Sequence, residues 1–306
     1  MNPENIHNLN EEGNTRPTIP SYGITRGGFL ILHAGCCHHD GDWNWKGVRS
    51  PFARLYYVSN GTAQVELPDG IKTLMPHHLY LIPAHTMHSD ICTSIFSHYY
   101  VHIYEAPDNT ASIFDELDLP FEVKAEPTDL QLMERLVNLN TQISLPQSDP
   151  NSYENHDTML SYLQQGISQP LSERMESQGI LQILMSRFIK QATPKNHIPD
   201  SRIHKALTYI RQHMNLDIDI ATLAEMSYMS KDHFIRVFHQ QTGSTPNAYI
   251  VRKKMEAAEL QLITSNVPVK QISLSLGYDD HSYFTKLFKK HTSLTPQQYR
   301  MTHRTN

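Results

Sequence analysis

The stretch GYDDHSYFTKLFKKHTSLTP, residues 277–296, decides how the end of this chain folds, because it repeats an earlier stretch, SYMSKDHFIRVFHQQTGSTP, residues 227–246. Four residues of the first stretch recur fifty positions later: Phe234 as Phe284, Phe238 as Phe288, Thr245 as Thr295 and Pro246 as Pro296. Upstream the offset is 49, because Ile272 corresponds to Leu223, so the second copy has one extra residue in its turn. An internal repeat of this kind indicates two copies of one supersecondary unit.

Each copy predicts a short helix, a tight turn and a longer helix. The short helices are expected over Ile220–Met226 and Val269–Leu276, and the longer ones over Lys231–Thr242 and His281–Thr292. Ser230 can cap the first longer helix, and Asp279 or Asp280 the second, by accepting a hydrogen bond from a free backbone amide. Gly277 suits the left-handed conformation that a sharp turn between helices needs. The repeat therefore predicts two helix-turn-helix units.

The longer helix of each unit has one apolar face, formed by Phe234, Val237 and Phe238, then by Phe284, Leu287 and Phe288. The opposite faces are free to enter a DNA major groove, where Arg and Lys pair with guanine. The predicted base-reading residues are Asp232, Ile235, Arg236, His281, Ser282, Thr285 and Lys286. The predicted phosphate contacts are Ser230, Lys231, His239, Lys253, Lys254, Lys289, Lys290 and His291.

Charge is divided unevenly along the 306 residues. Residues 201–306 hold 14 Lys+Arg and 8 Asp+Glu, a balance of +6, which leaves 12 against 23, or −11, for residues 1–200. A solvated helix face or incidental surface charge would explain each cation singly. Two copies at a fixed spacing on a basic module instead favour binding to a polyanion.

The residues from Gly277 to His291, followed by Leu294-Thr295-Pro296 and Tyr299-Arg300, closely resemble the signature of AraC/XylS-type transcription regulators. The resemblance covers residues 201–301, with Ile203–Met214 as the opening helix and Thr245–Thr264 as the helix that joins the units. It implies that two recognition helices enter successive major-groove segments on one face of the duplex. Ser293 departs from the pattern, because the family usually has glycine there. Ile235, apolar at a position that often reads bases, suggests contact with a thymine methyl group.

The front half predicts antiparallel hairpins that close into a barrel or sandwich. Turn residues such as Asn60-Gly61 and Pro68-Asp69-Gly70 separate runs of alternating residues. The expected strands are Phe29–His33, Phe52–Ser59, Ala63–Leu67, Leu79–Ile82, Ile91–Phe96 and Tyr99–Tyr104. The stretches 51–61, 79–89 and 100–103 resemble, more loosely, the cupin-like arm of the same regulators, which implies a small effector in the barrel, often a sugar.

Histidines are frequent in this half and could line a ligand pocket, lie on the surface or bind a metal. His98 and His102 share strand parity, so both could point into the barrel with His88 nearby. The strand over residues 52–59 has no histidine, whereas metal-binding cupins carry a His-x-His pair, so we expect neither a metal nor another cofactor. Cys36-Cys37 could sense oxidants, although a structural role is the ordinary interpretation. The predicted effector-pocket residues are Arg54, Tyr56, His85, His88 and His102.

Helical periodicity follows the strands, over Asp129–Ile143 and Leu171–Gln191. These helices could seal the open face of the barrel or pair with a second subunit. The two prolines of residues 194–199 indicate a linker. The predicted organisation is multi-domain α+β: a disordered tail (1–18), a cupin-like sensor barrel (19–125), helices that pack on the barrel and form a dimer interface (126–192), a linker (193–200) and an all-α tandem helix-turn-helix domain (201–304).

The predicted function is that of an effector-responsive, sequence-specific transcription regulator, an activator rather than an enzyme. Its expected partners are double-stranded DNA, RNA polymerase, a small-molecule effector and a second copy in a homodimer. Three cysteines without CxxC spacing, a polar N-terminus and the lack of a long apolar run predict a cytoplasmic protein without a membrane partner. Two alternatives remain open: a ligand-independent regulator whose barrel only dimerises, and a metal-dependent cupin enzyme fused to a DNA-binding module.

Overall fold

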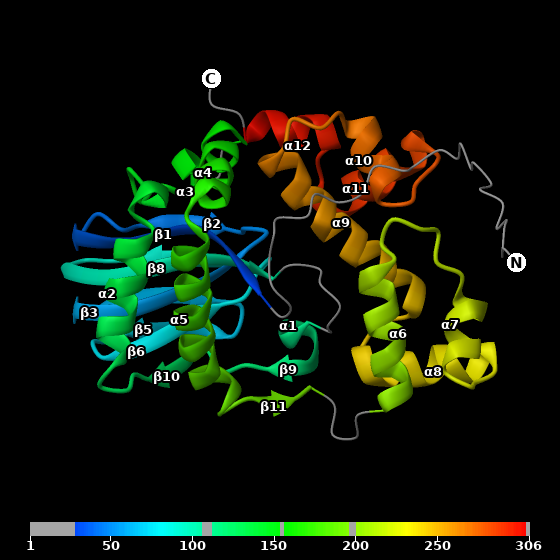
Figure 1. Ribbon diagram of the computed structural model, residues 1–306, viewed down its shortest axis with the longest axis horizontal. Coiled ribbons are helices and arrows are strands. Elements are labelled where there is room, and N and C mark those ends of the chain that lie inside the picture. The colour runs from blue at the N-terminus through cyan, green and yellow to red at the C-terminus, as the bar shows by residue number, and fades with distance from the viewer. Residues whose placement is uncertain (1–27, 106–111, 154–155, 196–199, 304–306) are drawn as a thin grey trace, which may run out of the picture.

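The front half folds into two antiparallel sheets, seen on the left of Figure 1. The computed structural model describes residues 28–105, 112–153, 156–195 and 200–303, so the predicted tail lies outside it. One sheet has the strand order β1-β8-β3-β6-β10 and the other β2-β7-β4-β5. The strands are β1 (Phe29–Asp40), β2 (Trp45–Val48), β3 (Ala53–Gly61), β4 (Ala63–Leu67), β5 (Gly70–Leu74), β6 (His78–Ile82), β7 (His88–Ile91), β8 (Ile95–Glu105) and β10 (Glu122–Lys124).

The alternation of side chains along the central strand β3 gives this half two apolar cores. Tyr56 and Val58 point between the two sheets, where they pack with Trp43 and Phe96. The intervening Leu55 and Tyr57 belong to the core on the other face of the five-stranded sheet. Both faces of β3 are therefore buried, which explains why its sequence is apolar almost throughout.

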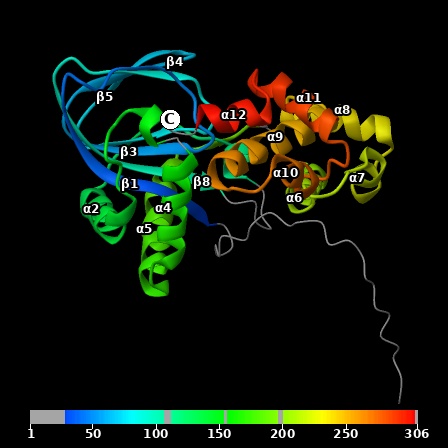
Figure 2. The ribbon, with the colours of Figure 1, turned by 90° about the horizontal axis from the view of Figure 1, so that it is seen from above.

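Helices cover the outer face of the five-stranded sheet (Figure 2). Met133 and Leu136 of α2 (Asp129–Leu139) and Leu184 and Phe188 of α5 (Leu171–Ile189) pack there. The shorter elements of this region are α1 (Ile113–Glu116), β9 (Leu117–Asp118), a 3-10 turn (Thr141–Ile143), α3 (Pro150–Tyr153), α4 (His156–Ser168) and β11 (Thr193–Pro194). No helix within the described ranges is both long and apolar enough to span a lipid bilayer.

One predicted strand of this half is wrong, and the first residues of the predicted linker make long-range contacts. The strand expected over Ile91–Phe96 is interrupted, because the Asn44 side-chain amide bonds both backbone groups of Cys92 and holds a turn between β7 and β8. The expected linker begins in regular structure, since Thr193 pairs with Asp118 in a two-stranded ladder and Lys195 donates its backbone N–H to Glu116. Neither long-range contact leaves a local trace in the sequence.

The C-terminal residues form the helices that the repeat predicts. They are α6 (Ser201–Gln212), α7 (Ile220–Met226), α8 (Lys231–Thr242), α9 (Pro246–Thr264), α10 (Val269–Ser275), α11 (His281–Thr292) and α12 (Pro296–Thr302). Ser230 caps α8 by accepting from the His233 N–H, and Asp280 caps α11 by accepting from Ser282 and Tyr283. Gly277 has φ +75, and a Cβ there would lie 2.6 Å from the Leu216 carbonyl carbon, so only glycine fits this turn.

The C-caps of the two longer helices give a matched test of backbone conformation. Gly243 has φ 70 and Ser293 has φ 68, and their N–H groups donate to His239 and Lys289 respectively. Because this left-handed conformation strains a residue with a Cβ, Ser293→Gly should raise the free energy of unfolding by about 0.5–1 kcal/mol. Chemical denaturation measures it.

The reciprocal variant is Gly243→Ser, where a Cβ would meet nothing within 4 Å, so no clash confounds the comparison. It should lower the free energy of unfolding by a similar amount. A Ser293→Gly protein no more stable than the parent would contradict this account.

Candidate DNA-binding surface and effector pocket

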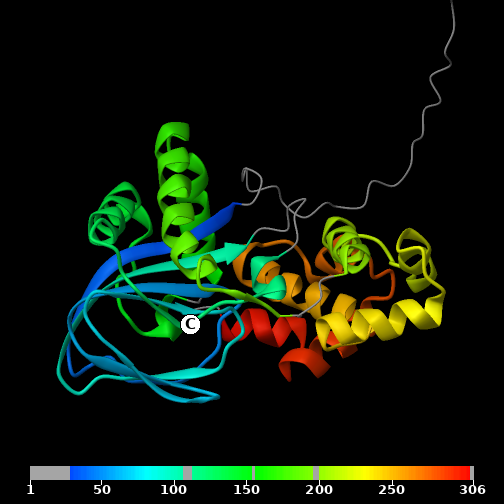
Figure 3. The ribbon, with the colours of Figure 1, turned by 90° about the horizontal axis from the view of Figure 1, so that it is seen from below.

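The two helix-turn-helix units use the same packing to present their second helices. Phe234 and Phe238 of α8 are fully buried in the first unit, as are Phe284 and Phe288 of α11 in the second. In Figure 2, α8 and α11 lie on the same side of α9, whereas α6 lies on the other; Figure 3 shows this arrangement from the opposite direction. The outward faces of α8 and α11 thus lie on one side of the domain, and together they are the candidate DNA-binding surface.

The predicted base-reading side chains lie on this surface at equivalent positions of the two helices. Five of them are exposed: Asp232, Arg236, His281, Ser282 and Lys286. Ile235 and Thr285 are half-buried at the same position of each unit, and Ile235 also packs against the first core. The Thr285 hydroxyl donates to the His281 carbonyl, so in this state it offers an acceptor and a methyl group.

The predicted phosphate contacts divide into two groups. Ser230, Lys231, His239, Lys289 and Lys290 are exposed on the surface formed by α8 and α11. The three others, Lys253, Lys254 and His291, contact groups of the protein itself, and the sequence did not predict these contacts. The Lys254 ammonium donates to the Leu216 carbonyl at 2.6 Å and lies 4.9 Å from the centre of the Tyr278 ring, and this side chain is only 3% exposed.

Lys253 and His291 are also paired with carboxylates of the protein. The Lys253 ammonium lies 2.9 Å from an Asp115 carboxylate oxygen and 3.0 Å from Glu256. The His291 Nε2 atom lies 3.0 Å from Glu259, whose side chain is fully buried. The three side chains share one physical feature: most faces of α9 are covered by other helices or by the front domain, so cations on or against it find partners within the protein.

The interior between the two sheets holds a cluster of polar side chains. Arg54, His88 and His102 are each 2% exposed, and Tyr56 is buried among them, so four of the five predicted pocket residues come together. The Arg54 guanidinium donates to Ser50 and lies 5.0 Å from the centre of the Phe52 ring. Aromatic rings of Trp43, Tyr56 and Phe96 surround His98 at centre-to-centre distances of 4.8–5.3 Å.

Burial keeps the histidines of this cluster uncharged. Desolvation, followed by repulsion from the Arg54 guanidinium, lowers the pKa of His33 to about 3 and of His88 to about 4. Burial alone is the main cause that lowers the pKa of His98 to about 3 and holds that of His102 well below its usual value. Burial also raises the pKa of Asp90 to about 7, against the opposing effect of Arg54. Neutral hydrogen-bonding groups therefore dominate the interior.

Several polar atoms of this interior have no hydrogen-bond partner among the described residues, although two of them, His88 Nε2 and Asp90 Oδ1, lie 3.9 Å apart. They are His88 Nε2, Asp90 Oδ1 and His98 Nδ1. A buried polar atom without a hydrogen bond costs free energy, and such atoms in a cluster point to a ligand or to water. Within the described ranges, no three His, Cys, Asp or Glu side chains lie close enough together to hold a metal ion.

His85, the fifth predicted pocket residue, lies elsewhere. Its backbone has φ 61, and its Nδ1 atom lies 3.7 Å from a Glu259 carboxylate oxygen, so it faces α9. It lines a cavity of about 390 Å³ between the front domain and the helices. We predicted a barrel position for His85 because it is close to His88 in the sequence. The turn between β6 and β7 instead directs its side chain toward α9.

The family that matches this chain covers its C-terminal helices. A helix-turn-helix domain family matches residues 223–302, which contain α8, α9 and α11. These residues form an AraC-type helix-turn-helix domain. An uncharacterised helix-turn-helix transcriptional regulator of Haemophilus influenzae is 29% identical over 153 residues, covering 47% of this chain and 51% of that protein.

Other relatives match the AraC/XylS-type domain over a similar extent. The arabinose operon regulatory protein of Escherichia coli is 29% identical, over 40% of this chain and 42% of its own length. The chain thus spans about half the length, or less, of these curated relatives. A solved structure of ToxT from Vibrio cholerae covers 90% of this chain and 98% of its own, with 10% identity and a TM-score of 0.48.

Two residues ahead of the AraC/XylS-type domain were missed as pocket candidates. Asp90 and His33 are both buried beside Arg54. The alternation of β7 could have indicated Asp90, because it is two residues from His88 and so shares its face. His33 is paired with His102 across β1 and β8, their Nδ1 atoms 3.0 Å apart, which only the strand register reveals.

The neutral cluster predicts the pH dependence of stability. On unfolding below pH 6.5, His33, His88, His98 and His102 regain ordinary pKa values and take up four protons. Asp90 acts in the opposite sense, because its raised pKa makes it release one proton on unfolding between about pH 4 and 7. The free energy of unfolding should therefore fall as pH decreases below 6.5, by up to about 4 kcal/mol per pH unit.

Urea titrations between pH 5 and pH 7, read by tryptophan fluorescence, would measure this slope, because both tryptophans lie in the front domain and Trp43 is buried. The matched variant is His98→Phe, which keeps a ring against Phe96 and removes one titrating group. Its slope should be shallower by about one proton. A parent protein equally stable at pH 5 and pH 7 would refute the assignment of neutral histidines.

Proposed function

We propose that this chain is a sequence-specific DNA-binding transcription regulator that responds to a small effector. The paired exposed faces of α8 and α11 on one side of α9 carry this proposal (Figure 3). The AraC-type helix-turn-helix domain supports it, as does a relative named as the regulator of the arabinose operon.

Each recognition helix would enter the major groove with its exposed face. Arg236 and Lys286 stand at equivalent positions of the two helices, and both are exposed. They would donate to guanine O6 and N7, while Asp232 and Ser282 reach neighbouring base edges. Lys289 and Lys290, on the last turn of α11, would hold phosphates and supply affinity without sequence preference.

Replacing one recognition cation tests this assignment. Arg236→Ala and Lys286→Ala should each cost about 1–3 kcal/mol of specific binding and relax base preference at one position of the site. The measurement is selection from a random-sequence duplex library, followed by titration of the selected duplex.

The control is Lys290→Ala on the same face of the domain. It should weaken binding to all sequences alike and reduce the salt dependence, because it removes one phosphate contact. An Arg236→Ala protein with the base preference of the parent would remove that residue from the readers.

The front domain is the effector site in this proposal, and we infer a cupin-like barrel whose interior takes the ligand. The neutral His88 and His98 rings and the Asp90 carboxyl, beside the rings of Trp43 and Phe96, suit an uncharged metabolite with several hydroxyl groups, such as a sugar. Apolar ring faces pack against the C–H groups of such a ligand while the polar atoms fix its orientation.

Calorimetric titration with a panel of neutral sugars and polyols tests the pocket. A ligand that binds the parent protein should bind His88→Ala more weakly by about 1–3 kcal/mol, because a buried hydrogen-bond partner is lost. His78→Ala is the matched control, since His78 is only half-buried and lies at the start of β6. Equal affinity of the parent and His88→Ala for every bound ligand would place the effector elsewhere.

We further infer that the protein acts as a cytoplasmic homodimer that activates RNA polymerase. The proposed domains are residues 19–125, 126–192 and 201–304, with a short linker. α5 supports the dimer, because its outer face exposes Leu171, Met175 and Ile183 while its inner face packs on the sheet. An exposed apolar stripe on a helix suits a second copy of the same helix.

A further inference from the structure

The front domain is joined to the two helix-turn-helix units in different ways. Leu32 and Phe52 of the front domain belong to the same apolar core as Phe284 and Phe288 of the second unit. The core of the first unit, which includes Phe234, contains no described residue that precedes Ile203. The second unit therefore shares a dry core with the front domain, whereas the first unit does not.

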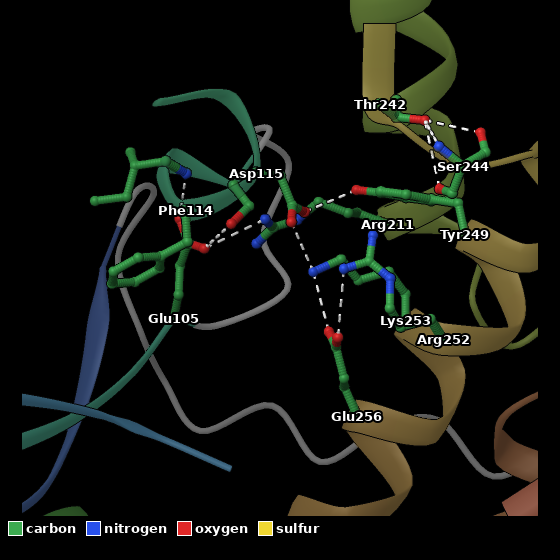
Figure 4. Close-up of polar contacts among 12 residues, drawn as sticks. Glu105, Phe114, Asp115, Arg211, Thr242, Ser244, Tyr249, Arg252, Lys253 and Glu256 are labelled. Atoms are coloured by element: carbon green, nitrogen blue, oxygen red, sulfur yellow. Dashed lines mark hydrogen bonds and ion pairs between the residues drawn. The ribbon is translucent and has the colours of Figure 1, made fainter. Parts of the chain in front are cut away.

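Polar contacts connect the front domain to the first unit and the adjoining start of α9. Glu105, at the end of β8, together with Asp115 and Glu116 of α1, form what we call the acidic latch. The Arg211 guanidinium of α6 lies 3.5 Å from Glu105, and the His204 ring contacts Glu116. Figure 4 shows Glu105 and Asp115 facing α6 and α9.

Asp115 is the centre of the acidic latch. One of its carboxylate oxygens lies 2.9 Å from the Lys253 ammonium, and the other accepts a hydrogen bond from the Tyr249 hydroxyl at 2.7 Å (Figure 4). Burial raises the pKa of Asp115, but the Lys253 charge and these hydrogen bonds outweigh burial and hold the pKa below its usual value. Asp115 is therefore ionised and strongly paired at neutral pH.

The acidic latch joins the domains through ion pairs and hydrogen bonds. Glu105 and Asp115 line the cavity of about 390 Å³ between the domains, and the Glu116 side chain is 34% exposed, so water reaches the acidic latch. Partly solvated ion pairs are screened by salt and contribute modestly to stability. Apolar burial of the kind seen at Phe52 and Phe284 is insensitive to salt and increases with the area removed from water.

We propose that the acidic latch is an autoinhibitory contact, which holds the first helix-turn-helix unit against the front domain and lowers its affinity for DNA. It places three carboxylates beside the DNA-binding module and occupies the charge of Lys253 and Arg211. It also fixes α8 relative to α11, which is docked through the apolar core. Release of the acidic latch frees these cations and lets the first unit adjust to the duplex. The inhibitory role rests on the DNA binding proposed above.

The test uses the full chain with Glu105→Gln and Asp115→Asn together. Hydrogen-deuterium exchange should become faster in α1 and α6 and stay unchanged in α11, because only the polar junction is weakened. Affinity for mixed-sequence duplex DNA at low salt should rise by about 3- to 10-fold, an increase that disappears at high salt.

Two controls separate a specific contact from general charge. Asp118→Asn removes the same charge three residues further along, from an exposed side chain on β9, and should change neither exchange nor affinity. Asp115→Lys combined with Lys253→Glu reverses the central ion pair and should restore slow exchange in α6, whereas Asp115→Lys alone should not.

The outcomes distinguish this proposal from the one on which it rests. Unchanged exchange in α6 of the double variant would overturn the acidic latch, whatever the DNA result. Faster exchange with unchanged DNA affinity, or an equal rise in affinity for Asp118→Asn, would overturn its inhibitory role. If neither the parent nor any variant bound duplex DNA, the proposed function would fail and so would inhibition, whereas the exchange result would still decide whether the contact exists.

Discussion

One buried carboxylate determines how the front domain sits against the helices. Glu259 of α9 is fully buried and accepts hydrogen bonds from Arg49 at 3.1 Å and from the Tyr299 hydroxyl at 3.0 Å. Burial raises its pKa, but His291, His85 and Arg49 outweigh that effect and keep the pKa below its usual value. An ionised group inside a protein must stay paired, so this carboxylate keeps two loops of the front domain, α11 and α12 in one arrangement.

The same constraint makes α9 the shared component of the molecule. Its first half contributes Tyr249 and Ile250 to the core of the first unit, and its second half contributes Leu262 and Ile263 to the core of the second. A helix buried on most faces transmits the position of one end to the other, since packed interiors resist small adjustments. Movement of the front domain can therefore reach both units. It reaches the second through an apolar core and the buried Glu259 carboxylate, and the first through the acidic latch.

Features that depend on residues close together in the sequence could be predicted, whereas features that depend on contacts between distant residues could not. The caps at Ser230 and Asp280 and the helices of the repeat depend on neighbours within four residues, and they were predicted correctly. His85 and Lys253 have partners more than a hundred residues away, Glu259 and Asp115 respectively, and the sequence revealed neither contact. The strands β2 and β5 were missed because their exposed, polar sequences show no apolar alternation.

The positive charge that the C-terminal residues offer to DNA is smaller than their balance of +6 indicates. Arg300 donates to the Leu262 and Val267 carbonyls, Lys254 donates to Leu216, and Arg211 and Lys253 face carboxylates of the acidic latch, so four cations serve the protein's own architecture. Because salt-dependent affinity scales with the phosphates neutralised, the exposed cations of α8 and α11 contribute to it on the helices that would also read bases. Affinity and specificity are then coupled in the same two helices. Release of the acidic latch would add the charges of Arg211 and Lys253 to the DNA-binding module without unfolding an apolar core.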